Sequence, residues 1–418
     1  MTNNQVSPLN TGPFFWLMAS VFVVALGYGV ALPMLPFFLE GLLADSSQLS
    51  VSWHVGIITS IYLFAMFLFA PLWGRLSDKV GRRPVILVGL GGFIVMLGMF
   101  ALSRELWFAY ASRLLAGLFA LSVLPVASAY IADTGSPDLR ARRFAWMGTA
   151  GLLGLLAGPM LGGWLSDMSE QWLSFAGRIN VNPVSMPFFT AAALGTAVWC
   201  VAYLEIPRHA TNAVDRSVPD QPSTPHRSRS INILLLLTLL MMFGLGSFEV
   251  GLTLHGQQNL SLGPNQLSMM FIACMLVMIA TQGLVFPFLI KRWPVHFIAP
   301  PAFAVMAGGL AFLPVALDFG RLLVTVGLVA AGSGLLAPIM SYRVSLAAGT
   351  AQGAVLGKQT AASSLGQAIG SIVAGFWFGL MSRWPFWATA GVLLIGVVLS
   401  AGMPLLSAQP VVRNGTPC

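Results

Sequence analysis

Charged residues are scarce in this sequence: Asp, Glu, Lys and Arg together make up 8% of its 418 residues. Soluble globular domains are about one-quarter charged, so a water-exposed surface does not account for this composition. Hydrophobic residues make up 57% of the chain, and the mean hydropathy is +0.82. The composition therefore excludes an ordinary soluble domain and indicates a protein that lies in a lipid bilayer.

Cysteine is also rare, and the first basic residue comes late in the chain. The three cysteines, Cys200, Cys274 and Cys418, lie far apart and lack the spacing of metal ligands or of a disulfide framework. No basic residue precedes Arg75, whereas a cleavable signal peptide starts with a basic segment. We therefore expect no metal and no cofactor, and we expect the first apolar segment to stay in the protein.

Long apolar segments follow one another along the whole chain. A membrane-spanning helix needs about 20 mostly apolar residues, and its backbone polar groups must be paired within the segment. The pattern predicts an all-α membrane protein with twelve transmembrane helices in two six-helix bundles. We expect these helices at about 13–38, 54–73, 85–103, 106–131, 144–165, 185–206, 231–254, 267–290, 295–316, 322–342, 359–381 and 386–408.

The basic residues lie in the gaps between the apolar segments. Sixteen Lys and Arg fall in the loops on one side, four fall on the other, and Arg113 lies inside a segment. Cytoplasmic loops of membrane proteins carry the excess of Lys and Arg. We therefore expect both termini to be cytoplasmic. The net charge of +8 is attributed to orientation in the membrane, not to nucleic-acid binding.

A polar segment divides the chain into two halves. Residues 206–230 are rich in Pro, Ser, Thr and Arg and have no apolar periodicity, which is typical of a flexible linker. We predict an N-terminal bundle at 1–205, a cytoplasmic linker at 206–230 and a C-terminal bundle at 231–418. Paired six-helix halves are typical of secondary transporters, whose substrate site lies between the halves.

The segment GRLSDKVGRRP at 74–84 places five charges in eleven residues of an otherwise apolar chain. Glycines allow a tight turn and close helix approach, and an acid among bases allows ion pairs. The segment resembles the signature loop between the second and third spans of the major facilitator superfamily. The residues that carry the resemblance are Gly74, Asp78, Gly81, Arg82 and Arg83.

This resemblance implies a role for the loop as a latch between the two halves. The latch of the family includes an acid at the end of the fourth span, which is Asp133 here, and bases that follow it, such as Arg142. A simpler interpretation is that the bases only orient the chain. An orientation signal, however, requires neither an acid nor two glycines.

Two further segments are similar to motifs of the same family. In the fifth span, Gly154, Gly158, Pro159, Gly162 and Gly163 of GLLGLLAGPMLGG match the antiporter motif. Small residues at this spacing let helices pack closely, and proline bends a helix; ordinary small-residue packing is the alternative. The resemblance implies export in exchange for protons.

The first span contains LGYGVALPMLPFF, in which Gly27, Pro33 and Pro36 resemble the family's first-span motif in exporters. Such residues loosen or kink a helix, and we expect this helix to line the cavity.

Two ionisable residues lie within predicted spans, where charge is costly and usually functional. Arg113 and Gly117 of YASRLLAG resemble a family motif that implies a role in proton coupling, although Arg113 could also reach the membrane surface. Glu249 in the seventh span could carry the coupling proton or meet a cationic substrate, because a carboxyl group in low dielectric accepts a proton readily. The alternative is a rim residue bonded to water.

We therefore predict a proton-coupled exporter of small amphipathic molecules, similar to the drug and tetracycline efflux branch of the family. We expect a monomer in a bacterial inner membrane that uses small-molecule substrates, protons and the lipid bilayer as partners. An exporter of an endogenous metabolite such as a siderophore, and an uptake symporter, remain as alternatives. No nucleophile, metal-ligand or phosphate-binding pattern indicates an enzyme.

Overall fold

The computed structural model describes residues 11–43, 48–133, 137–176, 183–206, 225–348 and 352–402. These residues form helices and short connections, and no strand occurs among them. Twelve helical segments of this part of the chain are long and apolar enough to cross a membrane. The predicted all-α architecture with twelve spans is therefore confirmed.

Six long helices make up the first half, and a short 3-10 turn at Pro183–Ser185 precedes the sixth. These helices are α1 (Thr11–Leu42), α2 (Gln48–Val80), α3 (Arg82–Ala101), α4 (Leu106–Asp133), α5 (Pro137–Ala176) and α6 (Met186–Glu205). Several of them extend past the predicted spans, because hydropathy locates the membrane segment and not the polar turns that continue a helix beyond it.

The second half contains the remaining spans, and π-helical turns interrupt the regular hydrogen-bond pattern at two places. Its helices are α7 (Pro225–Leu254), α8 (Pro264–Ala280), α9 (Phe286–Arg292), α10 (Val295–Phe312), α11 (Phe319–Ala348), α12 (Gln352–Leu380) and α13 (Trp384–Ala401). The π-helical turns are His255–Asn259 and Thr281–Val285.

The eighth span is therefore not the single regular helix predicted at 267–290. It consists of α8, the π-helical turn Thr281–Val285 and α9. Pro287 lies two residues after the end of this turn and has no backbone N–H to continue the ladder of hydrogen bonds. A widened turn before proline accommodates this missing donor.

The two halves pack against each other mainly through two helix pairs, α2 with α12 and α5 with α8. Gly56 of α2 lies against Gly375 of α12 so closely that a Cβ atom on Gly375 would be 2.6 Å from Cα of Gly56. Beside them, the rings of Trp53 and Phe376 stack with centroids 5.1 Å apart. Since these residues lie near the start of α2 and the end of α12, this contact is at one end of the bundle.

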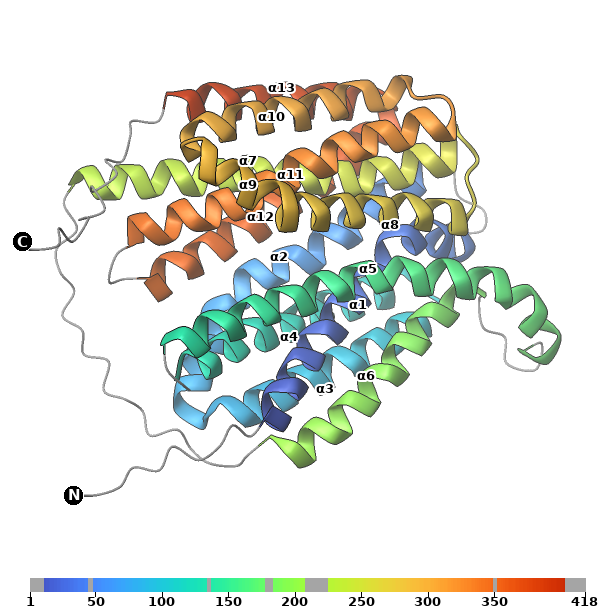
Figure 1. The fold of residues 1–418 in the computed structure, drawn as a ribbon. Coiled ribbons are helices and arrows are strands. Elements are labelled where there is room, and N and C mark those ends of the chain that lie inside the picture. The colour runs from blue at the N-terminus through green and yellow to red at the C-terminus, as the bar shows by residue number, and fades with distance from the viewer. Residues whose placement is uncertain are drawn as a thin grey trace, which may run out of the picture.

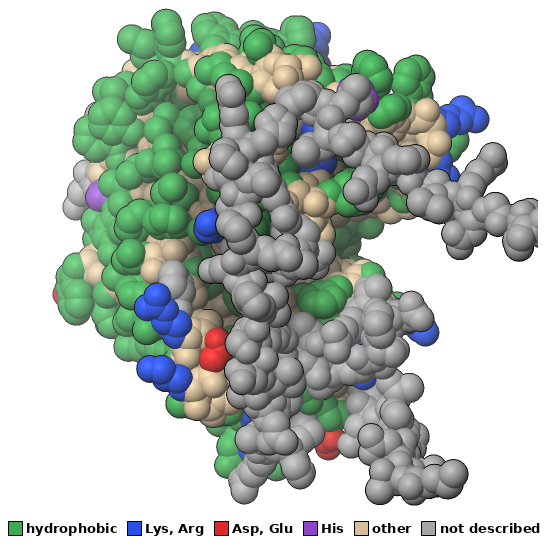
Figure 2. Space-filling view, turned by 90° about the vertical axis from the view of Figure 1, so that its left-hand side faces the viewer, with side chains coloured by type: hydrophobic (Ala, Val, Ile, Leu, Met, Phe, Trp, Pro, Cys, Tyr) green, Lys and Arg blue, Asp and Glu red, His purple; other side chains and the backbone are tan. Residues whose placement is uncertain are grey.

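The ends of the bundle differ, and we name them by the chain. The linker end is where α1 begins, α6 ends and α7 begins; the opposite end is the far end (Figure 1). A small hydrophobic cluster near the linker end, from Leu17 to Ile206, belongs to the first half alone, whereas the larger cluster extends across both halves. Figure 2 shows that the linker face is hollowed between the halves and carries Lys and Arg side chains. The bundle is thus closed at the far end and open at the linker end.

Candidate functional site

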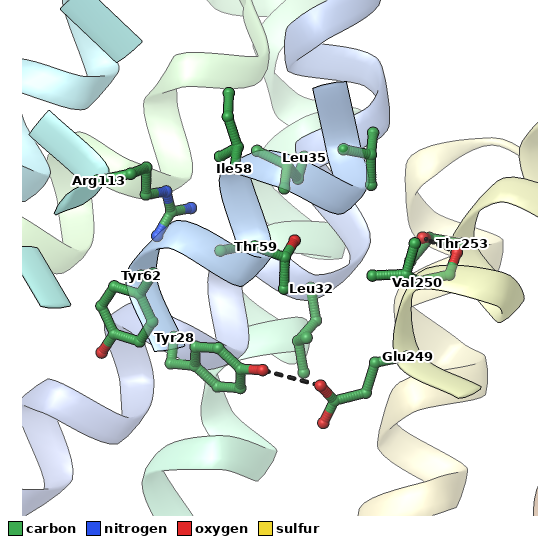
Figure 3. Close-up of a pocket in the computed structure, with 12 residues that line it drawn as sticks. Tyr28, Leu32, Leu35, Ile58, Thr59, Tyr62, Arg113, Glu249, Val250 and Thr253 are labelled. Carbon is green, nitrogen blue, oxygen red and sulfur yellow. Dashed lines mark hydrogen bonds between the residues drawn. The ribbon is translucent and has the colours of Figure 1, made fainter. Parts of the chain in front are cut away.

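A pocket lies between the two halves, about midway along α1 and α2 and toward the far end of α4 and α7. The cavity is small in this conformation, at about 20 Å³. Half of its lining residues are polar, but most of the surface that they expose to the pocket is apolar, which suits part of an amphipathic molecule. The polar lining residues are Tyr28, Thr59, Tyr62, Arg113, Glu249 and Thr253 (Figure 3).

Glu249 links three helices inside this pocket. Its carboxylate oxygen Oε2 accepts a hydrogen bond of 2.8 Å from the hydroxyl of Tyr28 in α1 and one of 2.8 Å from Nε2 of Gln367 in α12. The same nitrogen lies 3.0 Å from the Tyr28 hydroxyl, so the three side chains form a closed triangle. Because Glu249 is 4% exposed, the alternative of a water-facing rim residue does not fit.

Close packing of α7 against α12 places Glu249 beside Gln367. A Cβ atom on Gly246 would lie 2.2 Å from the carbonyl oxygen of Gln367, and one on Gly370 would lie 2.1 Å from that of Phe243. Any side chain at these positions would force the helices apart. The glycines therefore bring the two polar side chains within hydrogen-bond distance.

The antiporter-motif glycines position Tyr28 in the same way. A Cβ atom on Gly158 of α5 would lie 2.5 Å from the carbonyl carbon of Gly29, and one on Gly154 would lie 2.4 Å from the carbonyl oxygen of Phe22. The segment therefore packs α5 against α1, directly behind Tyr28. Pro159 takes part in this contact, since its Cδ would lie 3.2 Å from a Cβ atom on Gly29.

The last two glycines of the motif have different neighbours. A Cβ atom on Gly162 would meet Met34 of α1, at 3.3 Å, whereas one on Gly163 would meet Ser268 of α8, at 2.8 Å. Gly163 thus belongs to the contact between the halves.

The first-span motif lies in a continuous helix. Pro33 and Pro36 are inside α1, and a Cβ atom on Gly27 would lie 2.6 Å from the ring of Phe93 in α3. Of the residues near this motif, Tyr28, Ala31, Leu32 and Leu35 line the pocket. The expectation that this helix lines a cavity fits the structure.

Arg113 is the second ionisable residue of the pocket, and it is 4% exposed. Its guanidinium carbon lies 4.2 Å from the ring centroid of Phe100, 5.8 Å from that of Phe188 and 5.9 Å from that of Tyr62. A Cβ atom on Gly117 would lie 2.2 Å from the carbonyl oxygen of Tyr62, so this glycine lets α4 approach α2. The side chain therefore points into the protein and does not reach the membrane surface.

Two stacked tyrosine rings separate the charged groups of the pocket. The centroids of Tyr28 and Tyr62 are 5.5 Å apart at an interplanar angle of 20°. Figure 3 shows Tyr62 on the side of Arg113 and Tyr28 on the side of Glu249, to which its hydroxyl is bonded. The pocket thus has a cation on the first half and an anion on the second.

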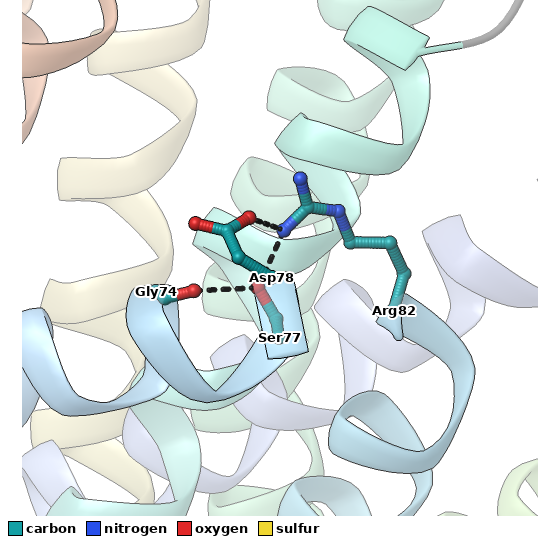
Figure 4. A network of polar contacts seen from close by, with 4 residues as sticks. All are labelled: Gly74, Ser77, Asp78 and Arg82. Atoms are coloured by element: carbon teal, nitrogen blue, oxygen red, sulfur yellow. Dashed lines mark hydrogen bonds and ion pairs between the residues drawn. The ribbon is translucent and has the colours of Figure 1, made fainter. Parts of the chain in front are cut away.

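The segment GRLSDKVGRRP forms two helix ends and a one-residue turn at the linker end, not an extended loop. Gly81 separates α2 from α3 and has a φ of +93°, a conformation that favours glycine. Asp78 accepts a hydrogen bond of 2.6 Å from Nη1 of Arg82, which also donates to the hydroxyl of Ser77 (Figure 4). The predicted ion pairing of Asp78 therefore occurs with Arg82.

The other residues of the predicted latch form no ion pair with Asp78 in the part of the chain that the structure describes. Arg83 donates to the backbone oxygen of Tyr203 in α6, and Arg142 is exposed. The side chain of Asp133 lies outside the described residues. A Cβ atom on Gly74 would meet nothing within 4 Å, so the close helix approach expected there is absent in this conformation.

Neither Tyr28 nor Gln367 is among the site residues that the sequence predicts. Polar side chains flanked by glycine in apolar segments, GYG at 27–29 and GQ at 366–367, were the available signal. Within the described part of the chain, no group of three or more His, Cys, Asp or Glu could hold a metal ion.

Comparisons with known proteins agree with this architecture. Residues 17–332 match the family model of the Major Facilitator Superfamily, so the chain belongs to this family of transporters. It is 26% identical to "Quinolone resistance protein NorA" of Staphylococcus aureus (strain COL) over 389 residues, which cover 92% of this chain and 95% of that protein. It is also 26% identical over 390 residues to "Multidrug resistance protein 1" of Bacillus subtilis (strain 168), with 92% and 94% covered.

Solved structures share the fold. A D-xylose-proton symporter superposes with a TM-score of 0.71 at 13% identity, covering 93% of this chain and 96% of its own. The human organic anion transporter MFSD10 gives a TM-score of 0.68 at 23% identity, with 94% and 100% covered. The chain is therefore a multi-pass membrane transporter and not an enzyme.

Proposed function

We propose that this transporter exports small amphipathic molecules from bacteria in exchange for protons. The observation that carries the proposal is Glu249, the only buried acid among the described residues, which bonds across the two halves inside the pocket. Two relatives that match almost the whole chain are named for resistance to quinolones and to multiple drugs. The largely apolar lining of the pocket suits such compounds.

The distribution of basic residues supports an orientation with the linker end in the cytoplasm. In that orientation the open hollow faces the cytoplasm, where a substrate for export enters. The far-end contacts, such as Gly56 with Gly375, then close the pocket toward the outside. Alternating access requires these contacts to part while the linker end closes.

Glu249 couples this change to protons. Hydrogen bonds to a carboxylate are about twice as strong as those between neutral groups. A proton on Glu249 removes the charge that strengthens its bond from Tyr28, and this weakens the connection between α7 and α1. Proton binding therefore changes the balance between the two conformations, and a substrate near the same carboxylate competes with the proton.

Transport in proteoliposomes with an imposed pH gradient tests the proposal. The Glu249→Gln variant, which cannot exchange a proton at this position, is expected to lose pH-driven transport by about tenfold or more. Exchange of labelled for unlabelled substrate without a gradient should persist. Glu105→Gln is the matched control, because Glu105 is exposed and lies between spans.

Three outcomes contradict the proposal. Undiminished pH-driven transport by Glu249→Gln removes Glu249 from the mechanism. Substrate movement in the same direction as protons indicates an uptake symporter. Transport of a secreted metabolite, with no transport of drug-like compounds, identifies an exporter of an endogenous product.

A further inference from the structure

Arg113 is a buried cation for which the described residues supply no anion. Its Nε and Nη2 atoms are shielded from solvent and make no hydrogen bond, and no carboxylate among the described residues lies within ion-pair distance of it. Buried charges in proteins are normally paired. An unpaired guanidinium that lines a pocket is therefore an anomaly that a bound anion would remove.

The rings around Arg113 position the cation without neutralising it. Phe100 of α3, Phe188 of α6 and Tyr62 of α2 surround the guanidinium. Aromatic faces attract a cation, but they offer no strong acceptor for its N–H groups. The cage therefore holds the charge in place and leaves its buried donors without a strong acceptor.

Glu249 does not fill this role. Its Oε2 atom accepts from both Tyr28 and Gln367, and it forms no ion pair with Arg113, which lies on the other side of Tyr28 (Figure 3). The pocket therefore keeps a cation available on the wall formed by the first half.

We propose that Arg113 forms an anion subsite of the transport pocket, which receives the carboxylate of an aromatic substrate. The inference rests on the proposed transport function and defines the substrate class of that site. A guanidinium matches a carboxylate through two parallel N–H donors, and the neighbouring tyrosine rings offer flat apolar faces to an aromatic body. A basic group on the same molecule would meet Glu249 on the opposite wall.

The test is equilibrium binding to the full-length protein in lipid nanodiscs without any gradient. The probes are a fluorescent quinolone-3-carboxylic acid and its ethyl ester, which differ in the negative charge. The wild-type protein should bind the acid about tenfold more tightly than the ester. Arg113→Gln should abolish this preference, and Arg113→Lys should retain part of it, because lysine keeps the charge and loses the paired donors.

The control is Arg343→Gln in α11. Arg343 is also buried, at 6% exposed, and its Nη1 atom is also unpaired, but it does not line the pocket. This variant should keep the preference for the acid. Equal loss in both variants would mean that overall charge, and not a local subsite, selects the acid, and would overturn the proposal.

Equal affinity of the wild-type protein for acid and ester, or no binding of the acid, also overturns the proposal. If Arg113→Gln does not fold, as judged by size-exclusion chromatography, the proposal is tested by the acid-to-ester affinity ratio of the wild-type protein and of the Arg113→Lys variant. This readout is independent of proton coupling. If Glu249→Gln has no effect on pH-driven transport, the proposed coupling mechanism is contradicted. The ratio of acid to ester affinity, which is measured without a gradient, is unaffected by that result.

Discussion

The hydroxyl of Tyr28 donates a hydrogen bond of 2.8 Å to Glu249, although the two residues are 221 positions apart and belong to different halves of the transporter. Gln367 closes the triangle from a third helix. Most other contacts between the halves that the structure describes are near the far end. This bond therefore connects the two halves at the pocket itself.

Removing the Tyr28 hydroxyl should change the balance between conformations. Hydrogen bonds to charged groups contribute about 1.5–3 kcal/mol, so Tyr28→Phe should shift the population by about tenfold or more away from the form open at the linker end. Spin labels on α2 and α12 at the far end would measure this as longer distances in electron paramagnetic resonance. Tyr62→Phe is the control, because the Tyr62 ring stacks on Tyr28 while its hydroxyl bonds to no described residue. Equal shifts in both variants would contradict a role for the bond.

A methyl group on Gly375 should prevent closure of the far end. Its Cβ atom would lie 2.6 Å from Cα of Gly56, and neither backbone can yield without separating the helices. Overpacking of this kind costs about 1–3 kcal/mol, which should lower the fraction closed at the far end several-fold. The reactivity of a cysteine introduced at the far end of α12 should rise. Gly391→Ala, where a Cβ atom meets nothing within 4 Å, should leave the reactivity unchanged.

The antiporter motif should contribute to the stability of the first half. Gly158→Ala places a methyl group 2.5 Å from the carbonyl carbon of Gly29, which should destabilise the protein by about 1–3 kcal/mol and displace the adjacent Tyr28. Thermal unfolding in detergent should show a lower midpoint, and transport should fall. Gly148→Ala, in open space on the same helix, should be neutral or stabilising by up to about 1 kcal/mol. A wild-type midpoint for Gly158→Ala would refute the packing argument.

Asp78 should matter for transport and little for stability. Its ion pair with Arg82 is 2.6 Å long, but the Asp78 side chain is 66% exposed, and surface ion pairs contribute about 0–1 kcal/mol. If Asp78 acts in the latch that closes the linker end, Asp78→Asn should reduce transport about tenfold or more while unfolding is nearly unchanged.

The control for that experiment is the exposed pair of Asp318 with Arg321, 3.0 Å apart near the start of α11. Asp318→Asn removes a similar ion pair outside the motif and should leave transport intact. Full transport by Asp78→Asn would support the simpler interpretation of the segment as an orientation signal.

Much of the architecture follows from composition and periodicity. The number and order of the spans follow because apolar segments avoid water and backbone groups in lipid must be paired locally. The excess of Lys and Arg in the loops on one side of the membrane is likewise visible in the sequence. Close helix packing at the motif glycines is also predictable, because such packing in membranes requires small residues. Helix ends and the π-helical turns in the second half were not predictable, since hydropathy does not report where polar turns continue or widen a helix.

The composition of the pocket was only partly predictable. Glu249 and Arg113 stand out because a charge in an apolar span is costly wherever it lies. Tyr28 and Gln367 do not stand out, since a tyrosine or glutamine in a span is unremarkable until its neighbours are known. Their role depends on three helices whose backbones touch at Gly246, Gly370 and Gly158.

The sequence alone determined that this protein is helical and spans the membrane many times, because hydrophobicity and small-residue spacing are local properties of the chain. The tertiary structure alone decided which end is open, which partners hold Glu249 and that no described carboxylate pairs with Arg113. These are contacts between residues up to hundreds of positions apart, and the packing of whole helices sets them.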